Sequence, residues 1–294
     1  MRIVSLLPSA TDILFAIGAG DDVVGVTFEC DVPDGSRGPR IVSGTVLPEG
    51  LEPGAIDAMV KARAAAGDSL YTLDEGALRS LRPDLVVTQD LCAVCAIDVA
   101  EVDAALHHLG CTAEVVTLDP MDLGQVWATV EEVGRVTGHD REAHRLVGRL
   151  QDRLGRVASR VAGRPRPRVA VLEWTDPPFC SGHWVPDMVA AAGGQSVLGR
   201  SGTRSTQVTW DQVQAAGAEL IVVAPCGYDL GGARELAAGL VASGRLPAGV
   251  PVWAVDADAA FVRPGPHLVD GVEALAAIVH PGPVPPSERL AAAV

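Results

Sequence analysis

The strongest constraint on the fold is an alternation of strand and helix patterns that occurs twice along the 294 residues, separated by one long helix pattern. Short apolar runs such as residues 168–172 and 219–224 are typical of buried strands, and helical spacings follow them. Residues 140–161, bracketed by Gly138 and Pro165, would form a helix spanning ~33 Å. Because strand–helix alternation is typical of parallel sheets, we predict an α/β fold with two lobes joined by this helix.

The same pattern divides the chain into three parts. We expect an N-terminal α/β lobe over residues 1–120, a helical linker with the long helix over 121–163, and a C-terminal α/β lobe over 164–294. A hydrophobic content of 48% allows each lobe a core of its own. Residues from 281 onward are rich in proline and are expected to form a loose tail.

Charge and hydropathy restrict the partners of the chain. The net charge is −14 and Lys61 is the only lysine, which argues against a nucleic-acid partner, since phosphate binding depends on basic side chains. No run reaches the ~18 apolar residues of a membrane span, so membrane insertion is not expected. The apolar run at the start of the sequence is shorter than that of a signal peptide, so we do not expect it to act as a secretion signal. We therefore expect a cytoplasmic protein with a small-molecule ligand and reduced cysteines.

Residues 173–186 concentrate chemically active side chains directly after the apolar run 168–172. Three prolines in this stretch predict a loop at the carboxyl end of a strand, where ligands bind in open α/β sheets. The stretch combines a thiol, an imidazole, two carboxylates and three aromatic residues, a mixture that no core element needs. Its candidate site residues are Glu173, Trp174, Phe179, Cys180, His183 and Trp184.

Further candidates follow other apolar runs at the points where strands are expected to end. They are Phe28, Glu29 and Cys30, then Cys92 and Cys95, then Cys226 and Tyr228, and finally Phe261 and Arg263. The two glutamates could act as bases or ligands, although solvated carboxylates at a cleft rim are the simpler interpretation. Six of the eleven aromatic residues lie in these loops, which favours a large, flat or apolar ligand. Core filling beneath the loops is the alternative.

Five of the six cysteines fall after expected strands, whereas Cys111 stands at the start of one. Cys92 and Cys95 have the spacing of metal ligands, which is compatible with zinc, an iron–sulfur cluster or a redox pair. His183 could be a further ligand, a general acid or a structural histidine. The candidate metal ligands are Cys30, Cys92, Cys95, Cys180, His183 and Cys226.

Three motifs carry a resemblance to a known family. They are the opening Ile-Val-Ser-Leu-Leu-Pro-Ser-Ala-Thr-Asp-Ile-Leu over residues 3–14 with Gly18, Leu-Arg-Pro-Asp-Leu-Val-Val over residues 81–87, and Arg-Pro-Gly-Pro over residues 263–266 with Leu-Val-Asp-Gly over residues 268–271. With these motifs the chain resembles the class III substrate-binding proteins of ABC importers, and within them the cobalamin (vitamin B12) binding proteins. The resemblance implies two Rossmann-like lobes, one long connecting helix and a ligand in the cleft between the lobes. Members of that family dock to an ABC permease, but such docking is doubtful for a chain that is expected to be cytoplasmic.

Two functional hypotheses follow from the residues and the resemblance together. The first is a cytoplasmic binding protein that holds a corrinoid such as cobalamin, or another metal-containing ligand, in the inter-lobe cleft. The second is a metalloenzyme that uses a cysteine-ligated zinc or iron–sulfur centre in the same cleft. Whether the chain is an enzyme stays open at this point.

Overall fold

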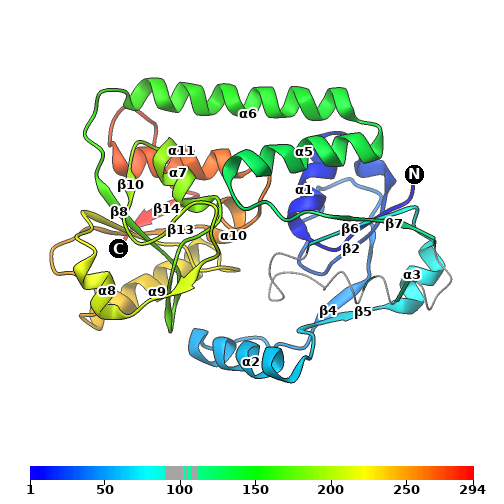
Figure 1. Cartoon of the computed structure of the whole chain (residues 1–294), viewed down its shortest axis with the longest axis horizontal. Coiled ribbons are helices and arrows are strands. Elements are labelled where there is room, and N and C mark those ends of the chain that lie inside the picture. Colours follow the sequence, from blue (N-terminus) through cyan, green and yellow to red (C-terminus); the bar gives the residue numbers. More distant parts are fainter. Residues whose placement is uncertain (90–101, 103–104, 107–111) are drawn as a thin grey trace. The chain divides into compact units, whose positions relative to one another are not determined.

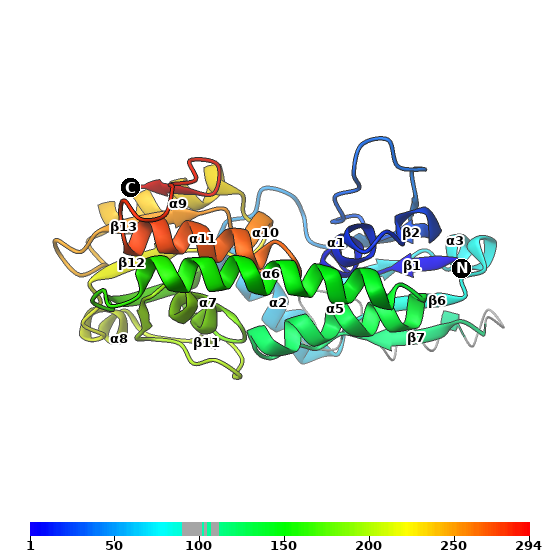
Figure 2. The same ribbon diagram turned by 90° about the horizontal axis from the view of Figure 1, so that it is seen from above.

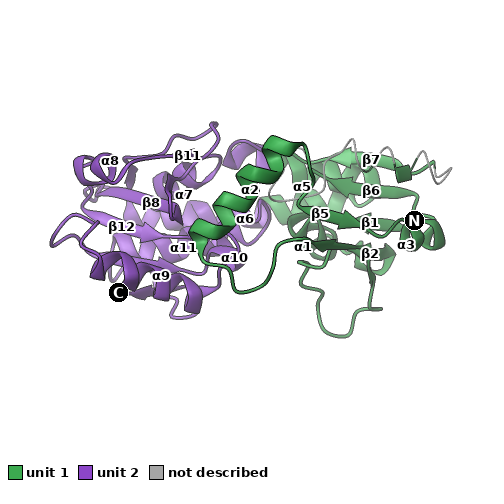
Figure 3. Ribbon diagram, turned by 90° about the horizontal axis from the view of Figure 1, so that it is seen from below, with its two compact units in different colours: residues 1–119, 127–147 green, residues 120–126, 148–294 purple. Residues whose placement is uncertain are grey.

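A computed structural model describes residues 1–89, 102, 105–106 and 112–294 of the chain. These residues form two compact units (Figure 3). Unit 1 comprises Met1–Asp119 with Trp127–Val147, and unit 2 comprises Pro120–Val126 with Gly148–Val294. Each unit is built around a sheet that contains parallel strands, so the predicted α/β fold is confirmed. Among the described residues, no helix combines the length and apolar character needed to cross a membrane.

Unit 1 contains a five-stranded sheet in the order β3-β2-β1-β6-β7, with every neighbouring pair parallel. Its strands are β1 (Ile3–Ser5), β2 (Val23–Val26), β3 (Arg40–Ile41), β6 (Leu85–Thr88) and β7 (Glu114–Thr117). A separate antiparallel pair is formed by β4 (Ser43–Thr45) and β5 (Tyr71–Leu73). The helical elements are α1 (Pro8–Ala16), η1 (Gly20–Asp22), α2 (Pro53–Ala66), α3 (Glu75–Leu81) and most of α5 (Leu123–Thr137).

The starts of two helices show how local sequence sets their bounds. Asp74 caps α3 by accepting a hydrogen bond of 2.8 Å from the backbone N–H of Ala77. In α1 extended Leu7 precedes the helix and no side chain caps it. Pro8 begins this helix instead, where its missing N–H costs no hydrogen bond.

Unit 2 contains a seven-stranded mixed sheet in the order β11-β9-β8-β12-β13-β14, with β10 also paired to β8. Its strands are β8 (Arg168–Thr175), β9 (Pro178–Cys180), β10 (Gln195–Ser196), β11 (Thr206–Gln207), β12 (Leu220–Val223), β13 (Val252–Val255) and β14 (Ala291–Ala293). Its helices are α7 (Val185–Ala191), α8 (Trp210–Ala215), α9 (Leu230–Ala242), α10 (Ala257–Ala260) and α11 (Leu268–Val279). Figure 1 shows α7 and α11 on one face of this sheet and α8 and α9 on the other.

The strand β8 corrects one expectation from the sequence. A loop was expected to begin at Glu173, but β8 continues to Thr175 and returns through β9 as an antiparallel hairpin. The prolines permit this because Pro177, in a cis peptide bond after Asp176, lies in the turn, and Pro178 is the first residue of β9. The third proline lies near the start of α7, where a helix tolerates it.

The C-terminal residues correct a second expectation. Instead of forming a loose tail, Ala291–Ala293 form β14, which pairs antiparallel with β13 and places Ala293 opposite Trp253. Ala291 is only 9% exposed. The pattern of residues 281–294 could not reveal this strand, because three alanines carry little strand preference and the partner strand supplies the hydrogen bonds.

The long helix α6 runs from Asp140 to Val161 as predicted. Its residues up to Val147 belong to unit 1, where Gly134 of α5 lies so close to Ala143 that a Cβ on the glycine would stand 2.4 Å from the alanine Cβ. The residues from Gly148 belong to unit 2, where α6 runs beside α11 (Figure 2). The expected domain bounds at 120 and 163 stay predictions.

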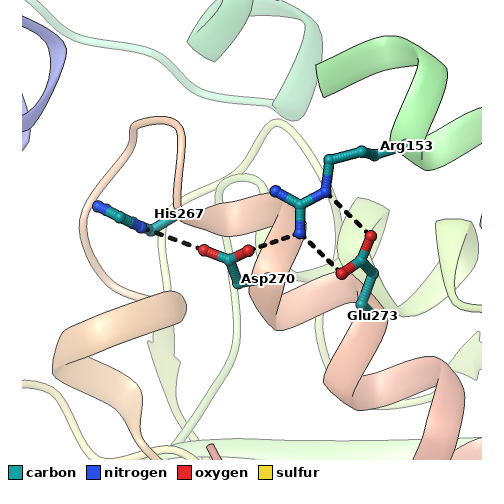
Figure 4. Close-up of polar contacts among 4 residues, drawn as sticks. All are labelled: Arg153, His267, Asp270 and Glu273. Atoms are coloured by element: carbon teal, nitrogen blue, oxygen red, sulfur yellow. Dashed lines mark hydrogen bonds and ion pairs between the residues drawn. The ribbon is translucent and has the colours of Figure 1, made fainter. Parts of the chain in front are cut away.

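An ion-pair network joins α6 to α11 within unit 2 (Figure 4). The Arg153 guanidinium donates to Asp270 at 2.6 Å and to both oxygens of Glu273 at 2.7 and 3.0 Å. His267 lies 3.1 Å from Asp270. Burial alone would raise the pKa of Asp270, but the hydrogen bonds of His267 and Arg153 hold this pKa below its ordinary value. The Arg153 side chain is 28% exposed, so the network is partly shielded from solvent.

We expect Arg153→Met to lower the free energy of unfolding by about 1 to 2 kcal/mol, between the effects typical of exposed and buried ion pairs. The substitution keeps the aliphatic stem but leaves Asp270 and Glu273 as neighbouring carboxylates without their cation. Urea unfolding measures the effect. Arg149→Met, at an exposed position of the same helix, is the control and should change stability by less than about 0.5 kcal/mol. Equal losses in both variants would contradict the role of the network.

Candidate functional site

Two aromatic residues meet at the carboxyl ends of neighbouring parallel strands in unit 2. Trp174 lies near the end of β8 and Tyr228 follows β12. Their ring centroids are 5.9 Å apart with an interplanar angle of 64°, an edge-to-face arrangement. The indole N–H of Trp174 donates to the backbone oxygen of Asp176 at 3.1 Å, which orients the ring. Both rings are only half-buried, so this aromatic pair offers a surface to a ligand.

Glu173 precedes Trp174 on β8. Its carboxyl group accepts hydrogen bonds from two residues that lie in separate segments of the chain, Ser205 and Gly182. Its Oε2 accepts a short hydrogen bond from the hydroxyl of Ser205, and its Oε1 accepts the backbone N–H of Gly182 at 3.4 Å. Its backbone oxygen accepts the N–H of Cys226 at 3.1 Å. Burial raises the pKa of Glu173 to about 7, although the hydrogen bonds from Ser205 and Gly182 act in the opposite direction. The side chain therefore titrates near neutral pH.

The two segments that meet at Glu173 are also joined through their backbones. The N–H of His183 donates to Thr203 at 2.6 Å, and the N–H of Gly202 donates to the oxygen of His183 at 3.2 Å. Gly182 lies against the opposite backbone, since a Cβ there would stand 2.4 Å from the nitrogen of Ser205. His183 adopts φ +49°, a left-handed conformation that is uncommon for any residue but glycine. The loop is thus held in one conformation by its neighbour.

Two buried polar atoms of this loop have no hydrogen-bond partner among the described residues. They are Oγ of Ser181 and Nε2 of His183. Burial, with a smaller contribution from Arg204, lowers the pKa of His183, so the imidazole is neutral at neutral pH. Its ring centroid lies 5.5 Å from that of Trp184. A neutral imidazole can bind a metal or accept a proton, yet neither role follows from these contacts alone.

Arg263 follows α10 and forms an ion pair with Asp258. Its guanidinium donates to both oxygens of Asp258, at 2.6 and 3.2 Å, and its side chain is 12% exposed. The backbone N–H of Asp258 donates to the oxygen of Tyr228 at 3.2 Å. The ion pair therefore supports the loop that carries Tyr228.

Other aromatic candidates of unit 2 lie deeper in the structure. Phe261 is 0% exposed and Trp184 is 5% exposed, and the indole N–H of Trp184 donates to the oxygen of Phe261 at 2.7 Å. Both rings are part of the buried core in this structure. Phe179 lies on β9 and is half-buried. The assignment of these three residues to ligand binding stays a prediction.

In unit 1 the candidate residues follow β2. Phe28 is half-buried, and its ring lies 6.2 Å from that of Tyr71. The sulfur of Cys30 lies 2.9 Å from the hydroxyl of Thr11, which in turn donates to Ser5. Glu29 is exposed. These contacts place all three candidates in one turn at the carboxyl end of a parallel strand.

The described cysteines do not form a metal centre. Cys30, Cys180 and Cys226 are free thiols, and Cys180 is buried with its sulfur 3.3 Å from the hydroxyl of Thr206. In the part of the chain that the structure describes, no three His, Cys, Asp or Glu side chains are grouped so that they could hold a metal ion. Cys92, Cys95 and Cys111 lie outside the described residues, so the expectation that rests on them stays a prediction.

Sequence patterns did not reveal several residues of this site. Ser205 and Gly182 complete the contacts of Glu173, and Asp258 pairs with Arg263. Ser205 lies between strands that the sequence did not predict, so no pattern connected it with Glu173. A signal existed for Gly182, because a glycine between polar residues after a strand often marks a close approach of two backbones.

Comparisons with known proteins give consistent results. The model of a family described as periplasmic binding protein matches residues 3–243. The vitamin B12-binding protein of Yersinia pestis is 23% identical over 226 residues, which cover 76% of this chain and 69% of that protein. A periplasmic vitamin B12 binding protein of Vibrio cholerae has a similar structure, with a TM-score of 0.66, 20% identity, and coverage of 95% of this chain and 96% of that chain. A periplasmic heme binding protein of Pseudomonas aeruginosa gives a TM-score of 0.68, 20% identity, and coverage of 99% and 97%.

The raised pKa of Glu173 predicts a pH dependence of stability. From its ordinary value of 4.5 up to about 7, the folded chain holds this proton more tightly than the unfolded chain, so stability falls as the pH rises. We expect Glu173→Gln to remove this loss and to gain about 2 to 3 kcal/mol relative to the wild type between about pH 5 and about pH 8. Urea unfolding at both pH values measures it.

Glu235→Gln, at an exposed position of α9, is the matched control and should follow the wild type at both pH values. If Glu173→Gln also follows the wild type, Glu173 titrates as an ordinary exposed carboxyl group and its burial does not matter.

Proposed function

We propose, from the premise that this chain belongs to the class III substrate-binding proteins of the periplasmic binding protein family, that its ligand is a metal-containing tetrapyrrole-like macrocycle. A corrinoid such as cobalamin is the first candidate. That the chain is a solute binder of this type, with the fold of the family, follows from the family match and the similar structures. The identity of the ligand is the proposal.

The half-buried pair Trp174 and Tyr228 carries this proposal. These rings lie where β8 and β12 end, at the edge of the sheet where open α/β folds bind ligands. A broad macrocycle needs a broad apolar contact, and two adjoining aromatic rings supply one. Because Glu173 and the Arg263–Asp258 pair hold the backbone on either side, this surface is organised before a ligand arrives.

The names of similar proteins support the same class of ligand. The Yersinia pestis relative and the Vibrio cholerae structure are named for vitamin B12, and the Pseudomonas aeruginosa structure is named for heme. Both ligands are flat macrocycles with a central metal, so they share the contact that the aromatic pair offers. The position of the ligand between two lobes and the cytoplasmic location of the chain stay predictions. No contact among the described residues favours the metalloenzyme alternative.

Titration with hydroxocobalamin and, separately, with hemin tests the proposal. We expect at least one of them to bind at micromolar concentration, measured by isothermal titration calorimetry and by the absorbance of the ligand. Trp174→Ala should raise Kd about two- to tenfold, because aromatic stacking contributes ~0.5–1.5 kcal/mol.

Trp210→Ala is the control, since Trp210 lies at the start of α8 under the guanidinium of Arg245 and outside the aromatic pair. Its Kd should equal that of the wild type. The proposal fails if neither compound binds, or if the two tryptophan variants bind equally well.

A further inference from the structure

We propose that the exposed arginine row of α6 within unit 2 is a docking surface for an acidic helix of a partner protein. The arginine row consists of Arg149, Arg156 and Arg160. Beside it runs a small-residue line, which consists of Gly148, Gly155 and Ser159. The row sets the charge of the partner and the line sets its distance. The proposal concerns an outer face of the chain and does not depend on the ligand.

The part of α6 that belongs to unit 2 is held by its opposite face. Leu150, Val157 and Val161 are buried, and Arg153 forms the ion pairs with α11 described above. At ~100° of rotation per residue, the small-residue line lies on the side of the helix turned away from these buried residues. Figure 1 shows α6 as the outermost helix of unit 2, with α11 on its inner side. The row and the line are therefore presented on a fixed helix.

The three arginines of the row are exposed, and among the described residues none of them forms an ion pair. In a chain with a net charge of −14, such a row is a local exception. At physiological ionic strength charges are screened over about 8 Å, so the row attracts a carboxylate at contact distance in spite of the overall charge. Arginine binds a carboxylate with two parallel hydrogen bonds. The row therefore favours a partner with glutamate or aspartate side chains.

Gly148 and Gly155 are unusual positions for glycine, because they lie inside a helix of 22 residues. Glycine destabilises a helix interior relative to alanine, since it loses more conformational freedom on folding. Neither position has a positive φ, and beyond the backbone of α6 itself no described atom would lie within 4 Å of a Cβ there. Gly134 of α5 differs, because Ala143 leaves no room for a Cβ. A partner that closely approaches the backbone of α6 explains both glycines.

The spacing of these residues indicates the shape of the partner. The two glycines are seven residues apart, and an arginine follows each of them. A seven-residue spacing keeps positions on the shared side of two helices that wind around each other. Ser159 and Arg160 repeat the order of small residue and arginine about one turn later. Residues 148–160 extend over ~18 Å at 1.5 Å per residue, so the geometry fits about three turns of a helix lying along α6.

Other occupants fit this face less well. A membrane or a nucleic acid is a broad anionic surface, and the net charge of the chain opposes its approach. Helices on membrane surfaces also bury large apolar side chains, and among the described residues the exposed ones all lie outside α6. A second copy joined through the same face would bring two arginine rows together. None of these objections applies to an acidic helix.

A pair of synthetic helical peptides tests the proposal on the full chain. The acidic peptide carries glutamates at seven- and four-residue spacing beside a line of alanines, and the control peptide carries glutamine at the same positions. Fluorescence anisotropy of the labelled peptides measures Kd. We expect Kd below about 100 µM for the acidic peptide at low ionic strength, and binding at least about tenfold weaker for the glutamine peptide. Acidic-peptide binding should weaken as NaCl rises from about 50 to about 300 mM.

Substitutions in α6 test the row and the line separately. Gly155→Leu fills the line without changing any charge. A triple variant, Arg149→Gln with Arg156→Gln and Arg160→Gln, removes the row. Each should weaken binding of the acidic peptide at least about tenfold. Asp152→Asn removes the only carboxylate between residues 148 and 164 and should tighten binding about two- to fivefold.

A matched control replaces three exposed arginines outside α6, Arg79, Arg234 and Arg289, by glutamine. It lowers the net charge by the same amount as the α6 triple variant, and its Kd should equal that of the wild type. Gly155→Leu should raise the melting temperature, because leucine favours a helix more than glycine does. Weaker binding by this variant is then not a consequence of unfolding.

Equal binding of the two peptides, or equal losses in the two triple variants, overturns the proposal. It also fails if Gly155→Leu binds like the wild type, because the row would then attract anions without a docked helix. A wild-type dimer in sedimentation velocity that Gly155→Leu abolishes would assign the face to a second copy instead. Binding to phosphatidylserine vesicles but not to the acidic peptide would assign it to a membrane.

Discussion

The parallel pairing of β8 with β12 is the interaction on which the candidate site depends. It aligns Val169 with Leu220 and Leu172 with Val223, and the next hydrogen bonds continue beyond the strands to Ala224 and Cys226. A shift of this register by one residue would turn Trp174 to the other face of the sheet, because strand side chains alternate. The apolar residues of both strands are buried and exclude such a shift. The position of the aromatic pair is thus a consequence of core packing.

In unit 2 the pKa values of two carboxyl groups, those of Asp270 and Glu173, are shifted in opposite directions. Asp270 is partly buried, but Arg153 and His267 stabilise its charge and hold its pKa low. Glu173 is placed beside donors that carry no charge, and for this group burial prevails over hydrogen bonding. The first arrangement is suited to joining two helices permanently. The second leaves a carboxyl group that changes charge near neutral pH, next to the aromatic pair that we propose contacts the ligand.

The sequence predicted an element correctly where the residues that mark its start and its apolar face all lie within that one segment. The bounds of α6 were predicted to the residue, because Gly138 and Asp140 mark its start and an apolar stripe runs along its length. The hairpin of β8 and β9 was missed, because its prolines are harmless only at the turn and at the first position of the second strand. The short strand β14 was missed for a related reason, since its pairing partner lies far away in the sequence.

The pattern of apolar residues and turn residues was enough to predict the α/β class and the long helix, because hydrophobic periodicity and turn residues are local properties. It also identified Glu173 and Trp174 as candidates. Only the tertiary structure decided that Glu173 meets Ser205 and Gly182, that Trp174 faces Tyr228, and that Trp184 and Phe261 are buried. Burial and hydrogen bonding between distant segments depend on the register of strands and the close approach of backbones. No pattern within a single segment contains that information.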